Sequence, residues 1–287
     1  MHYMRYHFLI CWLLLSSVSL NLLAAPTIIW PKHHWAPLMM QTDPNKAPGR
    51  FDQLIDLYIK SLPMYKHKII NMNWSRVWMQ IKSGAPVCNI AALRTTERES
   101  FALFSLPNSI AIPNKVIVKD SLYQQWRQPQ SISLNALTRN PQYKLIYEKE
   151  RSYSNLVDSI LSVSNSSPSV ESRNVNSAQL IKMLVYNRID YMIEYENVAR
   201  YHVQNIEFFD DKPTIRSISI EGHPEYYLGY IACPKTNWGR QTIQDLNKLL
   251  TKIRPSKAYR LAHKAWAASE KEAELLDRLF SKHILKL

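Results

Sequence analysis

The alternation of amphipathic helical segments with short apolar extended segments constrains this chain more than any other feature. Residues 73–84, NWSRVWMQIKSG, begin with an asparagine suited to capping a helix and repeat Val77, Trp78 and Ile81 at helical spacing. Residues 87–93, VCNIAAL, follow as a predominantly apolar strand. Apolar strands separated by helices are typical of parallel sheets covered by helices on both faces. The sequence therefore predicts an α/β fold.

This alternation occurs twice, which predicts two lobes. The first series contains expected strands at residues 27–30, 66–72 and 87–93. The second contains expected strands at 115–120, 143–149, 170–173 and 190–195, each pair separated by a helical segment. A strand at 225–233 then returns, and the remaining residues are expected to be helical. We predict lobe 1 at residues 26–113, lobe 2 at 114–228, and a return to lobe 1 with C-terminal helices at 229–287.

The connections between the lobes, near residues 112–117 and 225–231, are expected to form a hinge. Ligands of α/β folds bind at the carboxyl ends of strands, and small-molecule sites often lie between domains. We therefore expect the ligand between the two lobes.

The first 25 residues have the pattern of a secretory signal peptide. A basic start with Arg5 precedes an apolar segment, which closes with Ala24 and Ala25. The alternative is a retained membrane anchor, but the segment is near the lower length limit for spanning a bilayer and polar residues interrupt it. We predict cleavage after Ala24 or Ala25, export to the periplasm and a soluble mature chain.

The chain is basic, with a formal net charge of +13. Residues 114–228 hold thirteen basic and thirteen acidic side chains, whereas residues 26–113 hold ten and five, and residues 229–287 hold twelve and five. The excess positive charge thus belongs to lobe 1 and its helical tail. Solvated helix faces explain it, and attraction to anionic solutes or an anionic membrane surface is the alternative. An exported protein rarely meets nucleic acid, so no nucleic-acid partner is predicted.

Catalytic and metal-binding motifs are missing from the sequence. The nine histidines show no metal-ligand spacing, and no H-E-x-x-H, C-x-x-C or G-x-S-x-G occurs. With only five glycines, no phosphate-binding glycine loop is present. We predict no metal, no cofactor and no catalysis. Cys88 and Cys233 remain after signal removal, and they either pair in the oxidising compartment or stay as buried thiols.

Arg98 is the leading candidate for a ligand contact. It lies just after the apolar strand at 87–93, in the first turn of a helix that Thr95 or Thr96 could cap. A guanidinium there meets a carboxylate with two charge-assisted hydrogen bonds, whereas a cation in the first turn opposes the helix dipole. The alternative is plain capping, with Arg98 paired to a nearby acid.

Aromatic and acidic residues complete the candidate site. Trp30, Trp35 and Trp74 could stack on a flat or apolar part of a ligand, or belong to the core. Candidates from lobe 2 are Tyr153, Tyr195 and the acids Glu194 and Glu196. The two acids are expected to alternate across a strand, so that only one faces the cleft and the other is solvated.

Several motifs in order resemble the type II periplasmic solute-binding proteins, specifically the amino-acid-type, family 3 group. Lobe 1 of that group shows G-[FY]-D, then T-x-x-R, then F-S-x-P, and lobe 2 shows G-R-[VIL]-D before a strand. The corresponding segments here are GRFD at 49–52, TTER at 95–98, FSLP at 104–107 and NRID at 187–190. The match spans nearly the whole mature chain. The VC before T-x-E-R and the CPKT after the return strand resemble a less characterised branch of that group.

The resemblance implies a clamshell that closes on a small solute. In relatives, the T-x-x-R arginine binds the ligand carboxylate, which is the position of Arg98. An acid after the G-R-x-D strand binds the ligand ammonium, and Tyr195 stands there between Glu194 and Glu196. A lobe-2 turn that cups the carboxylate corresponds best to residues 151–154, which include Ser152 and Tyr153.

We therefore predict a monomeric periplasmic protein that clamps a small anionic or zwitterionic, amino-acid-like solute and presents its closed form to a membrane permease or sensor. One alternative is an enzyme of the same fold, such as a dehydratase that uses a cleft acid. Another is a degenerate clamshell that binds only a partner protein.

Overall fold

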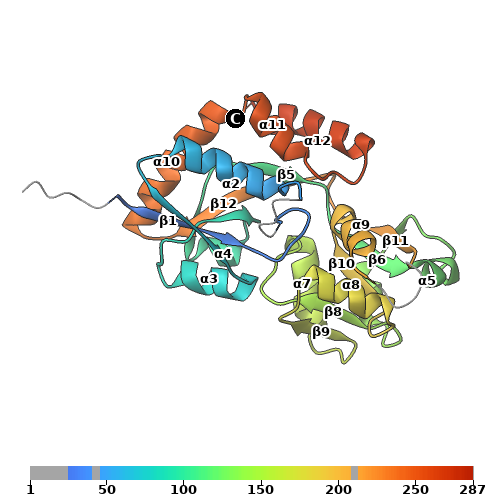
Figure 1. Ribbon diagram of the computed structural model, residues 1–287. Helices are drawn as coiled ribbons and strands as arrows, with labels where there is room; N and C mark the ends of the chain where they lie inside the picture. Colours follow the sequence, from blue (N-terminus) through green and yellow to red (C-terminus); the bar gives the residue numbers. More distant parts are fainter. Residues whose placement is uncertain (1–24, 41–45, 208–212, 287) are drawn as a thin grey trace, which may run out of the picture.

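The structure is a computed structural model that describes residues 25–40, 46–207 and 213–286. The predicted signal peptide lies outside the described residues except for Ala25. Within these ranges, no helix combines the length and apolar composition needed to cross a bilayer. The described residues form two bodies side by side, which we call lobe 1 and lobe 2 and define by their strands (Figure 1).

Lobe 1 is built from segments at both ends of the chain. Its strands are β1 (Thr27–Lys32), β2 (Lys66–Asn71), β3 (Asn89–Ala92), β4 (Ala102–Phe104), β5 (Ser109–Ala111) and β12 (Tyr227–Pro234). Its helices are α2 (Arg50–Ser61), α3 (Trp74–Lys82), α4 (Thr96–Glu99), α10 (Asn237–Ile253), α11 (Lys257–Lys264) and α12 (Glu270–His283). The C-terminal helices, orange and red, lie beside α2 (Figure 1).

The strands of lobe 1 form two sheets, β1-β2 and β3-β12-β4 with β5 paired to β12, which contain parallel and antiparallel pairs. β1 pairs with β2 in parallel, and a bridge from Ile29 to Val87 continues the order toward β3. β12 runs antiparallel to β3, β4 and β5 because it enters lobe 1 from the opposite side, after the chain has passed through lobe 2. A strand from late in the sequence is thereby placed against three early ones.

Lobe 2 is a continuous piece of the chain. Its strands are β6 (Lys115–Lys119), β7 (Ser131–Ile132), β8 (Leu145–Glu148), β9 (Val170–Arg173), β10 (Tyr191–Glu194) and β11 (Ile215–Ile220), in the sheet order β7-β11-β6-β10-β8-β9. Its helices are α5 (Asp120–Gln125), α6 (Leu134–Arg139), α7 (Asn155–Ser164), α8 (Ser177–Val185) and α9 (Glu196–Asn205). β8, β9 and β10 are parallel, whereas β6 runs antiparallel to β10 and β11.

The lobe 2 sheet is covered on both faces, as its apolar strands predict. Val116 and Val118 of β6 belong to one buried cluster, and Ile117 between them belongs to another. Leu161 of α7 packs into the first cluster, and Leu184 of α8 packs into the second. Side chains alternate across a strand, so an uninterrupted apolar run is stable only when both faces are dry.

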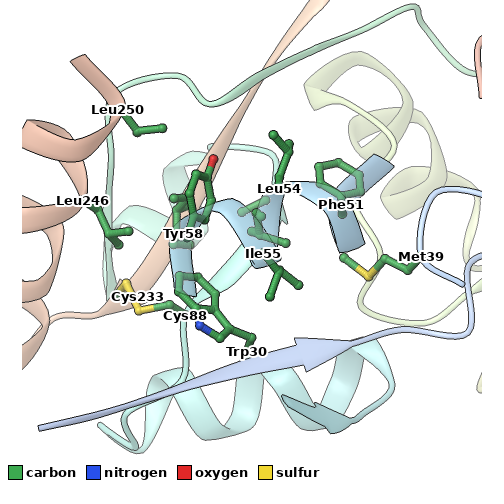
Figure 2. Packing of buried hydrophobic residues seen from close by; sticks show 14 of the residues in the cluster. Trp30, Met39, Phe51, Leu54, Ile55, Tyr58, Cys88, Cys233, Leu246 and Leu250 are labelled. Atoms are coloured by element: carbon green, nitrogen blue, oxygen red, sulfur yellow. A yellow bond between two sulfur atoms is a disulfide. The ribbon is translucent and has the colours of Figure 1, made fainter. Parts of the chain in front are cut away.

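The core of lobe 1 joins the two ends of the chain. Trp30 of β1, Tyr58 of α2 and Leu246 of α10 are buried in one cluster (Figure 2). Cys88 and Cys233 form a disulfide beside Trp30, and this bond links segments 145 residues apart in the sequence (Figure 2). The bond ties the return strand β12 to the end of the segment before β3.

Two connections join the lobes, one between β5 and β6 and one between β11 and β12. The first contains the predicted boundary at residues 113 and 114. The second precedes Tyr227, and the predicted boundary at 228 and 229 lies inside β12. The exact division of the chain into domains stays a prediction.

Candidate functional site

A cavity of about 60 Å³ lies between the lobes. Lobe 1 contributes Trp35, Trp74 and Arg98 to its wall, and lobe 2 contributes Arg151 and Tyr195. The carboxyl ends of β3, β8 and β10 lead into the segments that carry Arg98, Arg151 and Tyr195, and those of β1 and β2 lead into the segments that carry the two tryptophans. The cavity therefore lies where strand ends of both lobes meet.

The G-R-F-D segment positions the aromatic wall. Asp52 accepts hydrogen bonds from the amides of Met40 and Gly49, at 2.7 and 2.9 Å, and pairs with Lys32 at 3.0 Å. A side chain at Gly49 would place a Cβ 2.5 Å from the Leu38 carbonyl oxygen. Only glycine allows this approach, which holds the segment containing Trp35 and Leu38 against the start of α2.

Arg98 is buried in the cavity wall, with 8% of its surface exposed. Thr95 caps α4 by accepting from the Arg98 amide at 3.3 Å. The guanidinium donates from Nη1 to the Leu93 carbonyl at 3.1 Å and from Nη2 to the Glu150 carbonyl at 3.0 Å, and it lies 4.0 Å from the centre of the Trp78 ring. Burial lowers the pKa of Arg98 to about 10, so it remains charged at neutral pH.

Among the described residues, no carboxylate forms an ion pair with Arg98. Its two carbonyl partners belong to different lobes, because Leu93 follows β3 and Glu150 follows β8. Glu150 adopts a left-handed φ of 62°, which turns the chain at this point. Arg98 therefore connects the lobes and keeps a buried positive charge that no acid neutralises directly.

Arg151 and Glu194 form the central ion pair of lobe 2. Nη1 donates to Oε2 at 2.6 Å and Nη2 donates to Oε1 at 2.5 Å. Glu194 also accepts from Ser177 Oγ at 2.5 Å and from the Tyr195 amide at 2.8 Å. Burial alone would raise the pKa of Glu194, but these four donors hold it below its ordinary value. Glu194 is therefore a fully buried carboxylate with a permanent internal partner.

Aromatic rings surround the Arg151 guanidinium. Its central carbon lies 4.7 Å from the ring centre of Tyr153, 5.0 Å from that of Trp35 and 5.9 Å from that of Tyr195. Rings at these distances attract a desolvated cation. Burial would lower the pKa of Arg151, yet the charge and hydrogen bonds of Glu194 outweigh this and leave that pKa raised. The guanidinium is fixed in place and in its charge.

Glu148 lies near the same pair but does not share its charge. Its Oε2 is 3.7 Å from Arg151 Nη1. Burial, partly offset by Arg151, raises the pKa of Glu148 to about 8. Glu148 is mostly protonated at neutral pH, so Glu194 alone balances the charge of Arg151.

The remaining charged groups of the wall are mostly cationic. Glu196 is bound to Lys115 at 2.6 Å and to Arg200 at 2.5 Å. Arg50 is buried at the start of α2, donates to the Ala265 carbonyl at 3.4 Å and forms no ion pair among the described residues. Burial lowers the pKa of Arg50 to about 10, with Glu272 acting against this shift. No group of acids, histidines and cysteines in the described ranges could hold a metal ion.

Five of the eight predicted ligand contacts line the cavity, namely Arg98, Trp35, Ser152, Tyr195 and Glu196. Thr95 is used as a helix cap, Tyr153 lies behind Arg151, and Glu194 is buried beneath it, so these three do not reach the wall. Whether the five bind a ligand stays a prediction. Of the stacking candidates, Trp74 lines the cavity, whereas Trp30 belongs to the core of lobe 1.

The expected alternation of Glu194 and Glu196 on one strand is wrong, because residues two positions apart on a strand share a face and because the two acids do not lie on one strand. β10 ends at Glu194, Tyr195 is the N-cap residue, and Glu196 begins α9. Sequence reasoning also did not assign Arg50, Lys115 and Arg151 to the site. Arg50 is the inserted residue of the G-[FY]-D motif, and Arg151 begins the turn matched to the carboxylate-cupping segment. Both residues therefore lie in motifs that could have identified them as site residues.

The fold matches solved structures, although sequence comparison finds no relatives. No protein-family model matches the chain, and no curated protein matches it. An amino acid ABC transporter substrate-binding protein from Streptococcus pneumoniae, bound to L-arginine, superposes with a TM-score of 0.62 at 18% identity, over 88% of this chain and 95% of that one. A histidine kinase sensor domain with similarity to periplasmic binding proteins superposes with a TM-score of 0.65 at 14% identity. The match covers 84% of this chain and 96% of that one.

A third match is an ancestral amino-acid-binding protein described as a precursor of cyclohexadienyl dehydratase. It gives a TM-score of 0.63 at 15% identity and covers 84% of this chain and 95% of that one. Identities this low show the fold alone. The chain has the α/β type II periplasmic-binding fold, with two sheets flanked by helices, that amino acid ABC transporter substrate-binding proteins share.

Proposed function

We propose that this chain is an exported protein that clamps a small carboxylate-bearing solute between its lobes, for uptake or sensing. The observation that carries the proposal is the buried Arg98 guanidinium in the cavity wall, charged at neutral pH and bonded to carbonyl oxygens instead of a carboxylate. A carboxylate at this position would form charge-assisted hydrogen bonds, which are about twice as strong as those to neutral acceptors.

Contacts between the lobes support a clamp. Besides the bond from Arg98 to Glu150, Asn197 Nδ2 of α9 donates to the Trp266 carbonyl at 2.7 Å, and the Trp35 and Tyr195 ring centres lie 5.7 Å apart. The cavity wall comes from both lobes, so a solute bound there would contact both of them. Separation of the lobes would admit the solute, and closure would bury it.

The cellular role follows from the fold and from the amino-terminal segment. The signal-peptide pattern supports export to the periplasm, where the protein would act as a monomer. Transport matches and a sensor-domain match share the fold, so we propose either a membrane permease or a sensor as the partner. A solute assay alone does not separate these roles, whereas copurification with membrane proteins from cells grown on the identified solute does.

We propose binding without turnover. The two acids considered as catalysts are both fixed, Glu194 by Arg151 and Glu196 by Lys115 and Arg200. A general acid must be able to transfer a proton to the substrate, and paired carboxylates with a lowered pKa are poor proton donors. Release of product from prephenate-like acids would contradict this proposal.

The test compares Arg98 with a nearby arginine outside the cavity. Thermal shift of the wild type would be measured with small carboxylic acids, amino acids and the matched neutral amides. We expect stabilisation by acids and not by their amides, because only a ligand-bound native state raises the melting temperature. Arg98→Ala should then raise the dissociation constant of the acid that binds most tightly by at least about 30-fold, which is equivalent to about 2 kcal/mol of binding free energy.

Arg94→Ala is the control, because Arg94 is exposed and pairs with Glu99 outside the cavity wall. Its dissociation constant should stay close to that of the wild type. If Arg98→Ala binds as tightly as Arg94→Ala, or if the amides bind as well as the acids, the anion clamp is wrong.

A further inference from the structure

Glu194, the acid beneath Arg151 in the cavity wall, is already neutralised from within the protein. Glu194 directs both carboxylate oxygens at Arg151 and receives two further donors, from Ser177 and the Tyr195 amide. A carboxylate with this number of partners has no lone pair left in good geometry for a further cation. Glu194 is therefore unable to receive an ammonium group from a solute while Arg151 remains in place.

Burial and several contacts hold the Arg151 side chain in place. Its side chain is 3% exposed and lies among the rings of Trp35, Tyr153 and Tyr195, and Asn114 Oδ1 accepts from it at 3.4 Å. Moving it away would leave the Glu194 charge buried and unpaired, which is strongly unfavourable. The guanidinium is thus a built-in cation in the position where a cationic part of a solute would otherwise be attracted.

The other charges in the wall repel a cation as well. Four cationic side chains line the cavity, Arg50, Arg98, Lys115 and Arg151, against two carboxylates, Glu196 and Glu272. Glu196 is bound to Lys115 and Arg200, and the Glu272 carboxylate accepts from the Ala268 amide and acts on Arg50. Arg50 and Arg98 have no carboxylate partner among the described residues. The wall therefore has an excess of positive charge and of donors. Of its two carboxylates, Glu196 is paired with two cations, and Glu272 lies near the otherwise unpaired Arg50.

From this arrangement we propose that the solute is a carboxylate without an amino group. This inference rests on the proposed function and narrows it, because the same cavity takes the solute but rejects the zwitterionic form. A carboxylate would face Arg98 and Arg50, and an apolar or flat part would lie against Trp35 and Trp74. An ammonium on the same skeleton would be desolvated beside the Arg151 guanidinium, whose partner Glu194 already receives four donors.

Pairs of acids that differ in the amino group test the proposal on the wild-type protein. Suitable pairs are 3-phenylpropionate and phenylalanine, 4-methylpentanoate and leucine, glutarate and glutamate, and succinate and aspartate. Titration calorimetry should show the amine-free member binding at least about tenfold more tightly in every pair that binds. Equal or tighter binding of the amino acids would overturn this inference and leave the proposed function standing. If neither member of any pair bound, the proposed function itself would fail.

Substitution of Arg151 tests the physical cause of the preference. Arg151→Met removes the internal cation and leaves Glu194 within the aromatic enclosure, so the preference should reverse toward the amine-bearing member of each pair. Arg151→Lys keeps a positive charge there and should keep the preference for the amine-free member. If Arg151→Met does not fold, as judged by circular dichroism, the wild type and Arg151→Lys still decide the matter. Identical preference in all three folded proteins would refute the assigned role of Arg151.

Discussion

Arg151 and Glu194, 43 residues apart in the sequence, form a bidentate ion pair that is almost completely buried, with nitrogen–oxygen distances of 2.6 and 2.5 Å. The pair joins the turn after β8 to the end of β10, which are neighbouring strands of the lobe 2 sheet. Because Arg151 lines the cavity and Glu194 is buried beneath it, the pair contributes to the stability of lobe 2 as well as to the charge of the site.

Replacing one partner of this ion pair should lower the free energy of unfolding far more than replacing both partners. Glu194→Gln leaves the guanidinium buried without its counter-charge and should lower the free energy of unfolding by about 3–5 kcal/mol. The double variant Arg151→Met with Glu194→Leu removes both charges and should lose much less. Urea denaturation of the wild type, both variants and Arg94→Ala measures this. Equal losses in the single and double variants would contradict the assignment.

Glu148 should make stability fall as the solution becomes alkaline. Its pKa is raised by burial to about 8 in the folded protein, so the folded state holds a proton that the unfolded chain releases near pH 4.5. Stability from this proton is complete below about pH 4.5 and is lost as pH rises toward 8. His33, whose pKa burial lowers to about 3, acts in the opposite direction only below about pH 6.5.

The window from pH 6.5 to 8 therefore isolates Glu148 from His33. Over this interval the wild type should lose about 1.5 kcal/mol more than Glu148→Gln, which carries no titrating proton there. Urea denaturation at several pH values in this window provides the comparison. Parallel profiles for the two proteins would show that Glu148 is ionised in the folded state.

The disulfide between Cys88 and Cys233 should stabilise lobe 1 against unfolding. It closes a loop of 145 residues, which includes all of lobe 2. A cross-link over a loop of this length restricts the unfolded chain, and its loss should cost about 2–5 kcal/mol. Reductant should therefore lower the melting temperature of the wild type and leave that of the Cys88→Ala/Cys233→Ala variant unchanged. Two reactive thiols in unreduced, denatured protein would argue against the bond.

The sequence by itself determined the alternation of the main helices and strands and the ends of several helices, but it did not indicate α9 and β11, which lie between the expected strands at 190–195 and 225–233. Asn73 caps α3 by accepting from the Arg76 amide at 2.9 Å, and Thr95 caps α4 in the same way. These interactions join residues three positions apart, so they depend only on the neighbouring sequence. Apolar periodicity likewise identified the buried faces, because the repeat of a helix or a strand fixes which side chains share a face.

The tertiary structure alone decided which charges meet at the cavity. Arg151 faces Glu194 because β8 and β10 are neighbours in the sheet, and Arg98 reaches the Glu150 carbonyl because two lobes built from different parts of the chain approach each other. Neither partner is close in sequence, and no periodic pattern connects them. Local interactions specify the elements of this chain, whereas the packing of the two sheets specifies the charges and donors that face the cavity between them.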